Sequence, residues 1–163
     1  MYYNKKNVRV LIMDVDGTLT DGKIHISAQG ELFKSFDVKD GYSISITLPQ
    51  HKIIPVIITG RTSTIVEHRA KELGIKYLYQ GIKDKRECVQ MVSSELGIPL
   101  EQMACIGDDL NDLVMMELCG VRGCPSNAVN EVKKIADYIA ASEGGRGAVR
   151  EFVDWLTDVT CDK

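Results

Sequence analysis

The sequence predicts an α/β fold: a doubly wound, Rossmann-like parallel sheet with helices on both faces. Strand-like and helix-like segments alternate along most of the chain, which is the order that βαβ units produce. The strand-like segments are short aliphatic runs, as expected of strands that are buried on both faces of a parallel sheet. A further segment after the first strand breaks the alternation and predicts an inserted β-hairpin.

The first predicted strand, Val8–Met13, is largely aliphatic and ends in charge and glycine. A second strand of the same kind covers residues 53–58. In the helix that follows, Thr64 and Glu67 have the spacing of a capping box, and Gly74 is the predicted stop. These elements make up the first predicted βαβ unit.

The later elements repeat this order. Tyr77–Tyr79 is predicted to be a short third strand, and a helix with one apolar face covers residues 84–96 before Gly97. Met103–Ile106 is predicted to be a fourth strand. A final amphipathic helix is indicated by the spacing of its apolar residues, which are Val149, Phe152, Val153 and Leu156.

The predicted hairpin consists of residues 23–27 and 31–36, joined by residues 28–30. The chain shows no internal repeat, no low-complexity stretch and no linker. Its length of 163 residues suits one domain with a core of its own. We therefore expect residues 1–163 to form a single domain.

Composition excludes several classes of function. The net charge is −3 and no basic stripe is present, which argues against nucleic acid as a partner. No apolar run is long enough to span a membrane, and no signal peptide is apparent at the amino terminus. The five cysteines, an odd number without a CxxC pair, suit reduced thiols. We expect a cytoplasmic protein.

An acidic pair, Asp14 and Asp16, directly follows the first predicted strand. Ligands of open α/β sheets bind beyond the carboxyl ends of the strands. Two carboxylates about 4 Å apart repel by roughly 4 kcal/mol at an effective dielectric constant of about 20. A hard divalent cation such as Mg²⁺, which prefers oxygen ligands, removes this repulsion. The alternative is an acidic turn in which Gly17 supplies flexibility.

Other predicted strand ends also carry polar groups: Thr59, Lys85, and the acidic cluster of Asp108, Asp109 and Asp112. If the strands are parallel neighbours, these groups converge with the acidic pair on one edge of the sheet. Each group alone has a simpler interpretation. Thr59 can belong to an ordinary turn, a lone lysine such as Lys85 is usually solvated, and adjacent aspartates can cap a helix. Their order after successive strands favours a joint site.

This set of motifs resembles the haloacid dehalogenase superfamily of phosphotransferases. The motifs stand in the order of that family: Asp14-x-Asp16-Gly17-Thr18, Thr59-Gly60, Lys85 and Gly107-Asp108-Asp109-x-x-Asp112. The resemblance implies that Asp14 is the nucleophile and becomes an aspartyl phosphate. It implies that Asp16 protonates the leaving oxygen and then activates water. Thr59 would hydrogen-bond a phosphoryl oxygen, and Lys85 would neutralise the nucleophile and the phosphate.

The same resemblance implies Mg²⁺ as the cofactor. Its ligands would be Asp14, the backbone carbonyl of Asp16, and Asp108, with Asp109 or Asp112 in support. Such an arrangement suits phosphoryl transfer, in which most of the catalysis comes from positioning and from charges that surround the transferring group.

Motif spacing implies that the chain lacks a cap domain. Members of the superfamily usually carry a cap between the first and second motifs or between the second and third. The segments from Thr18 to Thr59 and from Thr59 to Lys85 are too short for one, after their strands and helices are subtracted. A neighbouring subunit can supply the missing wall of such an open site. The hairpin, residues 23–36, is therefore the candidate oligomerisation element.

The capless arrangement is similar to that of the 3-deoxy-D-manno-octulosonate 8-phosphate phosphatases, which are homotetramers. Local resemblances to them are Asp21-Gly22, residues 36–42, Thr59-Gly60-Arg61, Tyr79-Gln80-Gly81 and residues 144–151. They imply a small sugar-acid phosphate as substrate and a homotetramer. The implied substrate-binding residues are Asp16, Asp37, Val38, Lys39, Asp40, Gly41, Gly60, Arg61, Arg69, Lys85, Asn111 and Arg146. Arg146 would serve its own site or that of an adjacent subunit.

Alternatives remain at this stage. Ser45 stands where some relatives carry arginine, so a nine-carbon substrate such as 2-keto-3-deoxynononate 9-phosphate is an alternative to the eight-carbon one. Arg61 and Arg69 would suit a sugar-acid carboxylate through their forked donors, or they form salt bridges on a helix surface. A phospho-accepting receiver module and a retired phosphatase that serves as a binding subunit are the non-catalytic alternatives.

Overall fold

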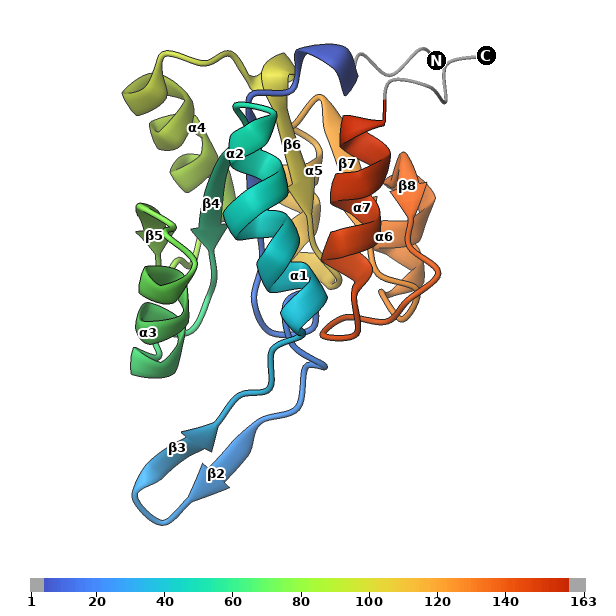
Figure 1. The fold of residues 1–163 in the computed structure, drawn as a ribbon. Helices are drawn as coiled ribbons and strands as arrows, with labels where there is room; N and C mark the ends of the chain where they lie inside the picture. The colour runs from blue at the N-terminus through green and yellow to red at the C-terminus, as the bar shows by residue number, and fades with distance from the viewer. Residues whose placement is uncertain (1–4, 159–163) are drawn as a thin grey trace.

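The computed structural model describes residues 5–158. Its centre is a six-stranded parallel sheet with the strand order β5-β4-β1-β6-β7-β8 (Figure 1). The strands are β1 (Val10–Met13), β4 (Ile54–Ile58), β5 (Tyr77–Tyr79), β6 (Met103–Ile106), β7 (Val121–Cys124) and β8 (Tyr138–Ile139). The predicted doubly wound α/β fold is confirmed. β1 lies in the middle, between β4 and β6.

Helices cover both faces of the sheet (Figure 1). One face packs against an unbroken helical segment of α1 (Val38–Tyr42), the π-helical turn η2 (Ser43–Thr47) and α2 (Leu48–Gln50), and against α3 (Thr64–Glu72) and α7 (Ala148–Thr157). The other face packs against α4 (Lys85–Leu96), α5 (Leu113–Met116) and α6 (Asn130–Ile135). Three short 3-10 turns complete these layers: η1 (Lys5–Asn7), η3 (Leu100–Gln102) and η4 (Leu110–Asp112).

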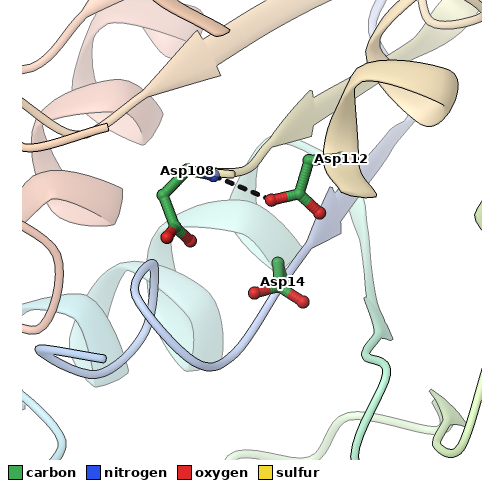
Figure 2. Close-up of side chains that lie close together, drawn as sticks. All are labelled: Asp14, Asp108 and Asp112. Atoms are coloured by element: carbon green, nitrogen blue, oxygen red, sulfur yellow. Dashed lines mark hydrogen bonds between the residues drawn. The ribbon is translucent and has the colours of Figure 1, made fainter. Parts of the chain in front are cut away.

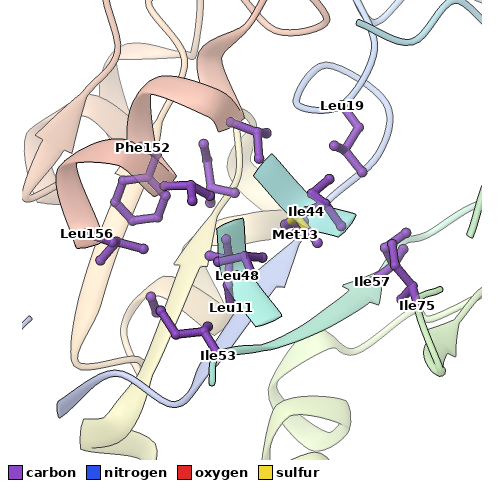
Figure 3. Packing of buried hydrophobic residues seen from close by; sticks show 14 of the residues in the cluster. Leu11, Met13, Leu19, Ile44, Leu48, Ile53, Ile57, Ile75, Phe152 and Leu156 are labelled. Carbon is purple, nitrogen blue, oxygen red and sulfur yellow. The ribbon is translucent and has the colours of Figure 1, made fainter. Parts of the chain in front are cut away.

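Strand β1 shows why its sequence is aliphatic throughout. Leu11 and Met13 point into the core that α7 and the helical segment 38–50 cover, where Figure 3 shows Met13 beside Ile44 and Leu11 beside Leu48. Val10 and Ile12 point into the opposite core, and all four β1 side chains are fully buried. Successive side chains of a strand alternate between faces, so a central parallel strand needs apolar residues at every position.

The predicted hairpin is present as β2 (His25–Ser27) and β3 (Gly30–Phe33), an antiparallel pair separate from the main sheet. It extends away from the body of the protein (Figure 1). Apolar side chains on it are exposed, with Ile26 at 70% and Leu32 at 60%. The chain between the first and second motifs thus holds this hairpin and the helical segment, and no cap domain stands there among the described residues.

Some local predictions were wrong or incomplete. The proposed capping box at Thr64 is not formed, because Ser63 is the N-cap of α3 and makes no side-chain capping bond. Strand β7 was not predicted, since its arginine and glycine interrupt the apolar pattern. The fold requires Gly123 there, because a Cβ atom would lie 2.7 Å from the Phe152 ring. The helical segment 38–50, α6 and β8 were also missed.

Within residues 5–158, none of the helices combines the length and apolar character needed to cross a bilayer. Of the five cysteines, four are described; they are free and buried, and Cys161 lies outside the described residues.

Candidate active site

The carboxyl ends of the central strands bring the predicted motifs together. Asp14 follows β1, which is paired in parallel with β4 on one side and β6 on the other. Thr59 follows β4 and Asp108 lies two residues beyond β6. A hydrogen bond of 3.1 Å from the backbone N–H of Asp14 to the carbonyl of Ile106 extends the pairing of β1 with β6 up to the acidic loop. The polar groups therefore meet at one edge of the sheet.

Lys85 lies buried between two carboxylates at this edge. Its Nζ donates to Oδ1 of Asp14 at 2.6 Å and to Oδ1 of Asp112 at 2.5 Å, and its side chain is 2% exposed. Helix α4 positions it as its first residue, with Asp84 capping the backbone N–H groups of Arg86 and Glu87. Burial alone would lower the pKa of Lys85, but Asp14 and Asp112 raise it above its usual value. The ammonium group is therefore charged.

Asp112, rather than Asp109, joins Asp14 and Asp108 in an acidic cluster. Figure 2 shows these three side chains, and one oxygen from each lies within 4.8 Å of the others. Oδ2 of Asp112 accepts the backbone N–H groups of Asp108 and Asp109, at 2.8 and 3.2 Å. The Asp109 carboxylate instead caps η4 by accepting from Leu110. The capping interpretation thus holds for Asp109, whereas Asp108 belongs to the cluster.

Electrostatics make this cluster suitable for a cation. Burial, together with repulsion from the neighbouring carboxylates, raises the pKa of Asp108 to about 7, although a hydrogen bond of 2.7 Å from the Thr18 hydroxyl opposes the shift. Burial, then repulsion from Asp112, raises the pKa of Asp14 to about 6 even though Lys85 opposes the shift. Lys85 pairs with Asp14 and Asp112, whereas Asp108 accepts from the Thr18 hydroxyl, so a divalent cation would supply the positive charge that the three clustered carboxylates still lack.

Glycine at position 17 is required by this packing. Its φ of +106° lies in the left-handed region, and a Cβ atom there would lie 2.0 Å from Oδ2 of Asp108. The acidic loop after β1 and the loop after β6 can therefore approach one another closely.

Asp16 is held by two cations at the mouth of the site. Lys34, just after β3, forms an ion pair with Oδ1 of Asp16, and Nε of Arg61 lies 3.7 Å from Oδ2. Glu31 contacts both Lys34 and Arg61. Sequence reasoning missed Lys34 and Glu31, because nothing local distinguishes them from surface residues of the hairpin.

An open pocket of about 420 Å³ lies beside these groups. It brings together eight residues from the three central strand ends: Asp14, Asp16, Thr59, Gly60, Arg61, Asp109, Leu110 and Asn111. Its size is in the usual range of small-molecule sites. Gly60, Arg61 and Asn111, three of the predicted substrate-binding residues, thus lie around the predicted nucleophile.

Other predicted substrate-binding residues lie elsewhere in the single chain. Asp37, Asp40, Gly41 and Arg69 line a separate small cavity with mostly apolar walls. Lys39 and Val38 are exposed, the latter by 80%. The side chain of Arg146 is 65% exposed and pairs with Glu143 at 3.4 Å. One chain alone therefore does not gather these residues around Asp14.

The carboxylate of Asp40 is buried in that second cavity. Its Oδ1 accepts from the backbone N–H of Arg150 at 2.7 Å, whereas Oδ2 has no partner. Burial raises the pKa of Asp40 to about 6. Arg69 packs with its guanidinium against Gly41, where a Cβ atom would lie 2.4 Å from the nearer nitrogen.

Comparisons with known proteins agree with this geometry. Residues 78–152 match the family model of the haloacid dehalogenase-like hydrolases. The chain is 43% identical over 151 residues to the 3-deoxy-D-manno-octulosonate 8-phosphate phosphatase KdsC of Escherichia coli K12, covering 93% of this chain and 80% of the relative.

Solved structures of phosphatases with this substrate name are also similar to this chain. The phosphatase of that name from Moraxella catarrhalis, in complex with a magnesium ion, a phosphate ion and KDO, has a TM-score of 0.90 and 41% identity over 94% of this chain and 88% of the other. The cobalt-bound enzyme from Haemophilus influenzae has a TM-score of 0.90 and 38% identity, over 93% of this chain and 88% of the other. The chain therefore belongs to the 3-deoxy-D-manno-octulosonate 8-phosphate phosphatase family of the haloacid dehalogenase-like hydrolases.

Proposed function

We propose that this protein is a Mg²⁺-dependent phosphatase that hydrolyses 3-deoxy-D-manno-octulosonate 8-phosphate to the free sugar acid and phosphate. The observation that carries the proposal is the buried Asp14–Lys85–Asp112 arrangement, whose Asp14 lines an open pocket together with Arg61. Identity of about two residues in five to phosphatases of this substrate supports it.

Asp14 is the proposed nucleophile. Its carboxylate attacks the phosphorus atom, and the bond to the sugar oxygen breaks as an aspartyl phosphate forms. Asp16 gives its proton to the departing oxygen and then takes one from the water that hydrolyses the intermediate. The hydroxyl of Thr59 and the ammonium of Lys85 bind phosphoryl oxygens. Dividing the hydrolysis into two displacements lowers the barrier of a very slow reaction.

The proposed metal ligands are carboxylate oxygens of Asp14 and Asp108 together with the backbone carbonyl of Asp16. Asp112 supports them by orienting the loop that carries Asp108. When bound, Mg²⁺ neutralises charge on the phosphoryl group and on the carboxylate that attacks it.

Arg61 is the proposed recognition group for the sugar-acid carboxylate, because its forked guanidinium lies in the pocket rim and is 45% exposed. Asp37, Val38, Lys39, Asp40, Gly41, Arg69 and Arg146 are proposed to complete the sugar site in the assembled protein. None of them lines the pocket beside Asp14 in the single chain, which is the reason for assigning them to a subunit boundary.

A substrate panel tests the function. With Mg²⁺ present, we expect kcat/KM for 3-deoxy-D-manno-octulosonate 8-phosphate to exceed that for p-nitrophenyl phosphate and for 2-keto-3-deoxynononate 9-phosphate. A preference for the nine-carbon compound would replace the proposed substrate with the larger one. Absence of turnover on every phosphomonoester would leave the receiver and retired-phosphatase alternatives.

Metal binding is expected to depend on pH. Because the pKa of Asp108 is raised to about 7 and that of Asp14 to about 6, the metal-free cluster is partly protonated at pH 6. Mg²⁺ must displace these protons, so its affinity should rise as pH increases from 6 to 8. Titration calorimetry in two buffers of different ionisation enthalpy measures both the affinity and the proton release. An affinity that is constant over this range would contradict the prediction.

The proposed assembly is a homotetramer in which the hairpin contacts neighbouring subunits. Ile26 and Leu32 expose apolar side chains on a hairpin that stands away from the body (Figure 1). Such side chains are typical of surfaces that become covered. We expect the double variant Ile26→Glu, Leu32→Glu to dissociate, as measured by light scattering. The matched control is Met91→Glu, at an exposed apolar residue of α4, which should leave the mass unchanged.

Two further expectations belong to this proposal. Residues 1–163 act as a single phosphatase domain, which the one main sheet with its two cores supports. The cytoplasm is the proposed compartment, since four free, buried cysteines suit a reducing environment.

A further inference from the structure

The side chain of Lys34 is buried although the residue belongs to the projecting hairpin. Its side chain is 2% exposed, and its Nζ contacts both Oδ1 of Asp16 and, at 3.1 Å, Oε1 of Glu31. A lysine with so little exposure is stable only when it is paired. The hairpin thus delivers an enclosed positive charge to the acidic loop of its own chain.

Glu31 connects this lysine to the loop after β4. Its carboxylate accepts from Arg61 at 3.3 Å and from the hydroxyl of the buried Ser63. Ser63 is itself fixed, since its backbone N–H donates to the side chain of Gln80 at 2.9 Å. The result is a continuous chain of contacts from the hairpin to two loops of the active site.

We propose that Lys34 is a positioning residue for Asp16, and that Glu31 holds Lys34 in place. This role rests on the proposed function, and it gives the hairpin a part in the proton-transfer step of its own subunit. A protonated carboxyl group that lines an open pocket can rotate so that its proton no longer faces the leaving oxygen. Contacts to Lys34 on one oxygen and to Arg61 near the other hold Asp16 in one orientation. Proton transfer depends on such placement, because the donor must lie within hydrogen-bond reach of the oxygen.

The test compares two leaving groups in the Lys34→Met variant. A sugar alkoxide needs a proton as it departs, whereas p-nitrophenolate leaves without one. We expect kcat/KM for the sugar phosphate to fall by about 100-fold, with a much smaller loss for p-nitrophenyl phosphate. Lys34→Arg should restore most of the sugar-phosphate activity. Lys134→Met, at an exposed lysine in the last turn of α6, is the matched control and should behave as wild type.

A double-mutant cycle separates positioning from direct substrate binding. If Lys34 acts through Asp16, Lys34→Met should add little to the loss already caused by Asp16→Asn. Equal losses on both substrates, additive losses in the cycle, or a change confined to KM would each overturn the inference. Glu31→Gln, which keeps the shape of the side chain, should show the same leaving-group dependence. It replaces Lys34→Met as the test variant if Lys34→Met is unstable.

The controls distinguish this inference from the proposed function. Normal wild-type turnover of the sugar phosphate, combined with an unselective Lys34→Met variant, would overturn the positioning role alone. A wild-type protein that hydrolyses neither phosphate would overturn both. Light scattering on Lys34→Met should give the wild-type mass, and a dissociated variant with unselective loss would assign Lys34 to assembly instead.

Discussion

The Asp14→Asn variant is expected to lose turnover by roughly 10⁴-fold or more while it keeps its fold. The amide cannot form the aspartyl phosphate, and the remaining groups can bind the substrate without a path to the intermediate. The fold should survive because Asn has nearly the same shape and because Lys85 retains Asp112 as its second partner, at 2.5 Å. Removing one of three clustered carboxylates also relieves repulsion.

The measurement is kcat on p-nitrophenyl phosphate with saturating Mg²⁺, together with thermal unfolding of the metal-free protein. We expect a melting temperature at or above that of the wild type, as is common when one charge is removed from a functional cluster of like charges. Asp154→Asn, in an exposed ion pair on α7, is the control and should retain full activity. Near-normal turnover of Asp14→Asn would reject Asp14 as the nucleophile.

Lys85→Met is expected to lose both activity and stability. Removing the ammonium group leaves two buried carboxylates, Asp14 and Asp112, without their shared partner. Breaking a buried ion pair in this way costs about 3–5 kcal/mol of the free energy of unfolding. The metal-free variant should be least stable at alkaline pH. The pKa of Asp14 is raised to about 6 and that of Asp108 to about 7, above their values in the unfolded chain, so the stability that these two groups contribute is lost as pH rises through the folded-state values.

Urea unfolding at pH 6 and pH 8, with and without Mg²⁺, measures these effects. Added Mg²⁺ should restore part of the stability, because a bound cation supplies charge where the ammonium group was. Lys83→Met, at an exposed lysine of the preceding loop, should unfold as the wild type does. Wild-type stability of Lys85→Met in metal-free buffer would show that the buried carboxylates do not need this partner.

Much of the fold could be predicted from local pattern. The first strand and Tyr77–Tyr79 and Met103–Ile106 stand out as apolar runs, and the structure places strands there with few changes at their ends. The first strand begins at Val10 instead of Val8. Burial on both faces imposes a continuous apolar pattern, so such strands are visible in the sequence. Strand β7 was missed because its arginine and glycine interrupt the apolar pattern, and β8 because it has only two residues and lies at the sheet edge, where this demand weakens.

The candidate site was predictable for the same kind of reason. Asp14, Thr59 and Asp108 each follow a recognisable strand, and parallel pairing of β1 with β4 and β6 necessarily brings such positions to one edge. Spacing did not show which of Asp109 and Asp112 lies beside Asp14 and Asp108, because both belong to one loop. It depended on which carboxylate accepts the backbone N–H groups there and which caps η4.

Contacts between residues far apart in the sequence could not be predicted from local pattern, because they depend on how the backbone folds. Lys34 reaches Asp16 across 18 positions and Lys85 reaches Asp14 across 71. The apolar pattern and the motifs establish which elements form and which chemistry their ends can carry, since neighbouring residues experience the same local backbone. Which long side chain is buried against which carboxylate follows from how the hairpin and helices pack, and a lysine has the same local pattern whether it is solvated or enclosed.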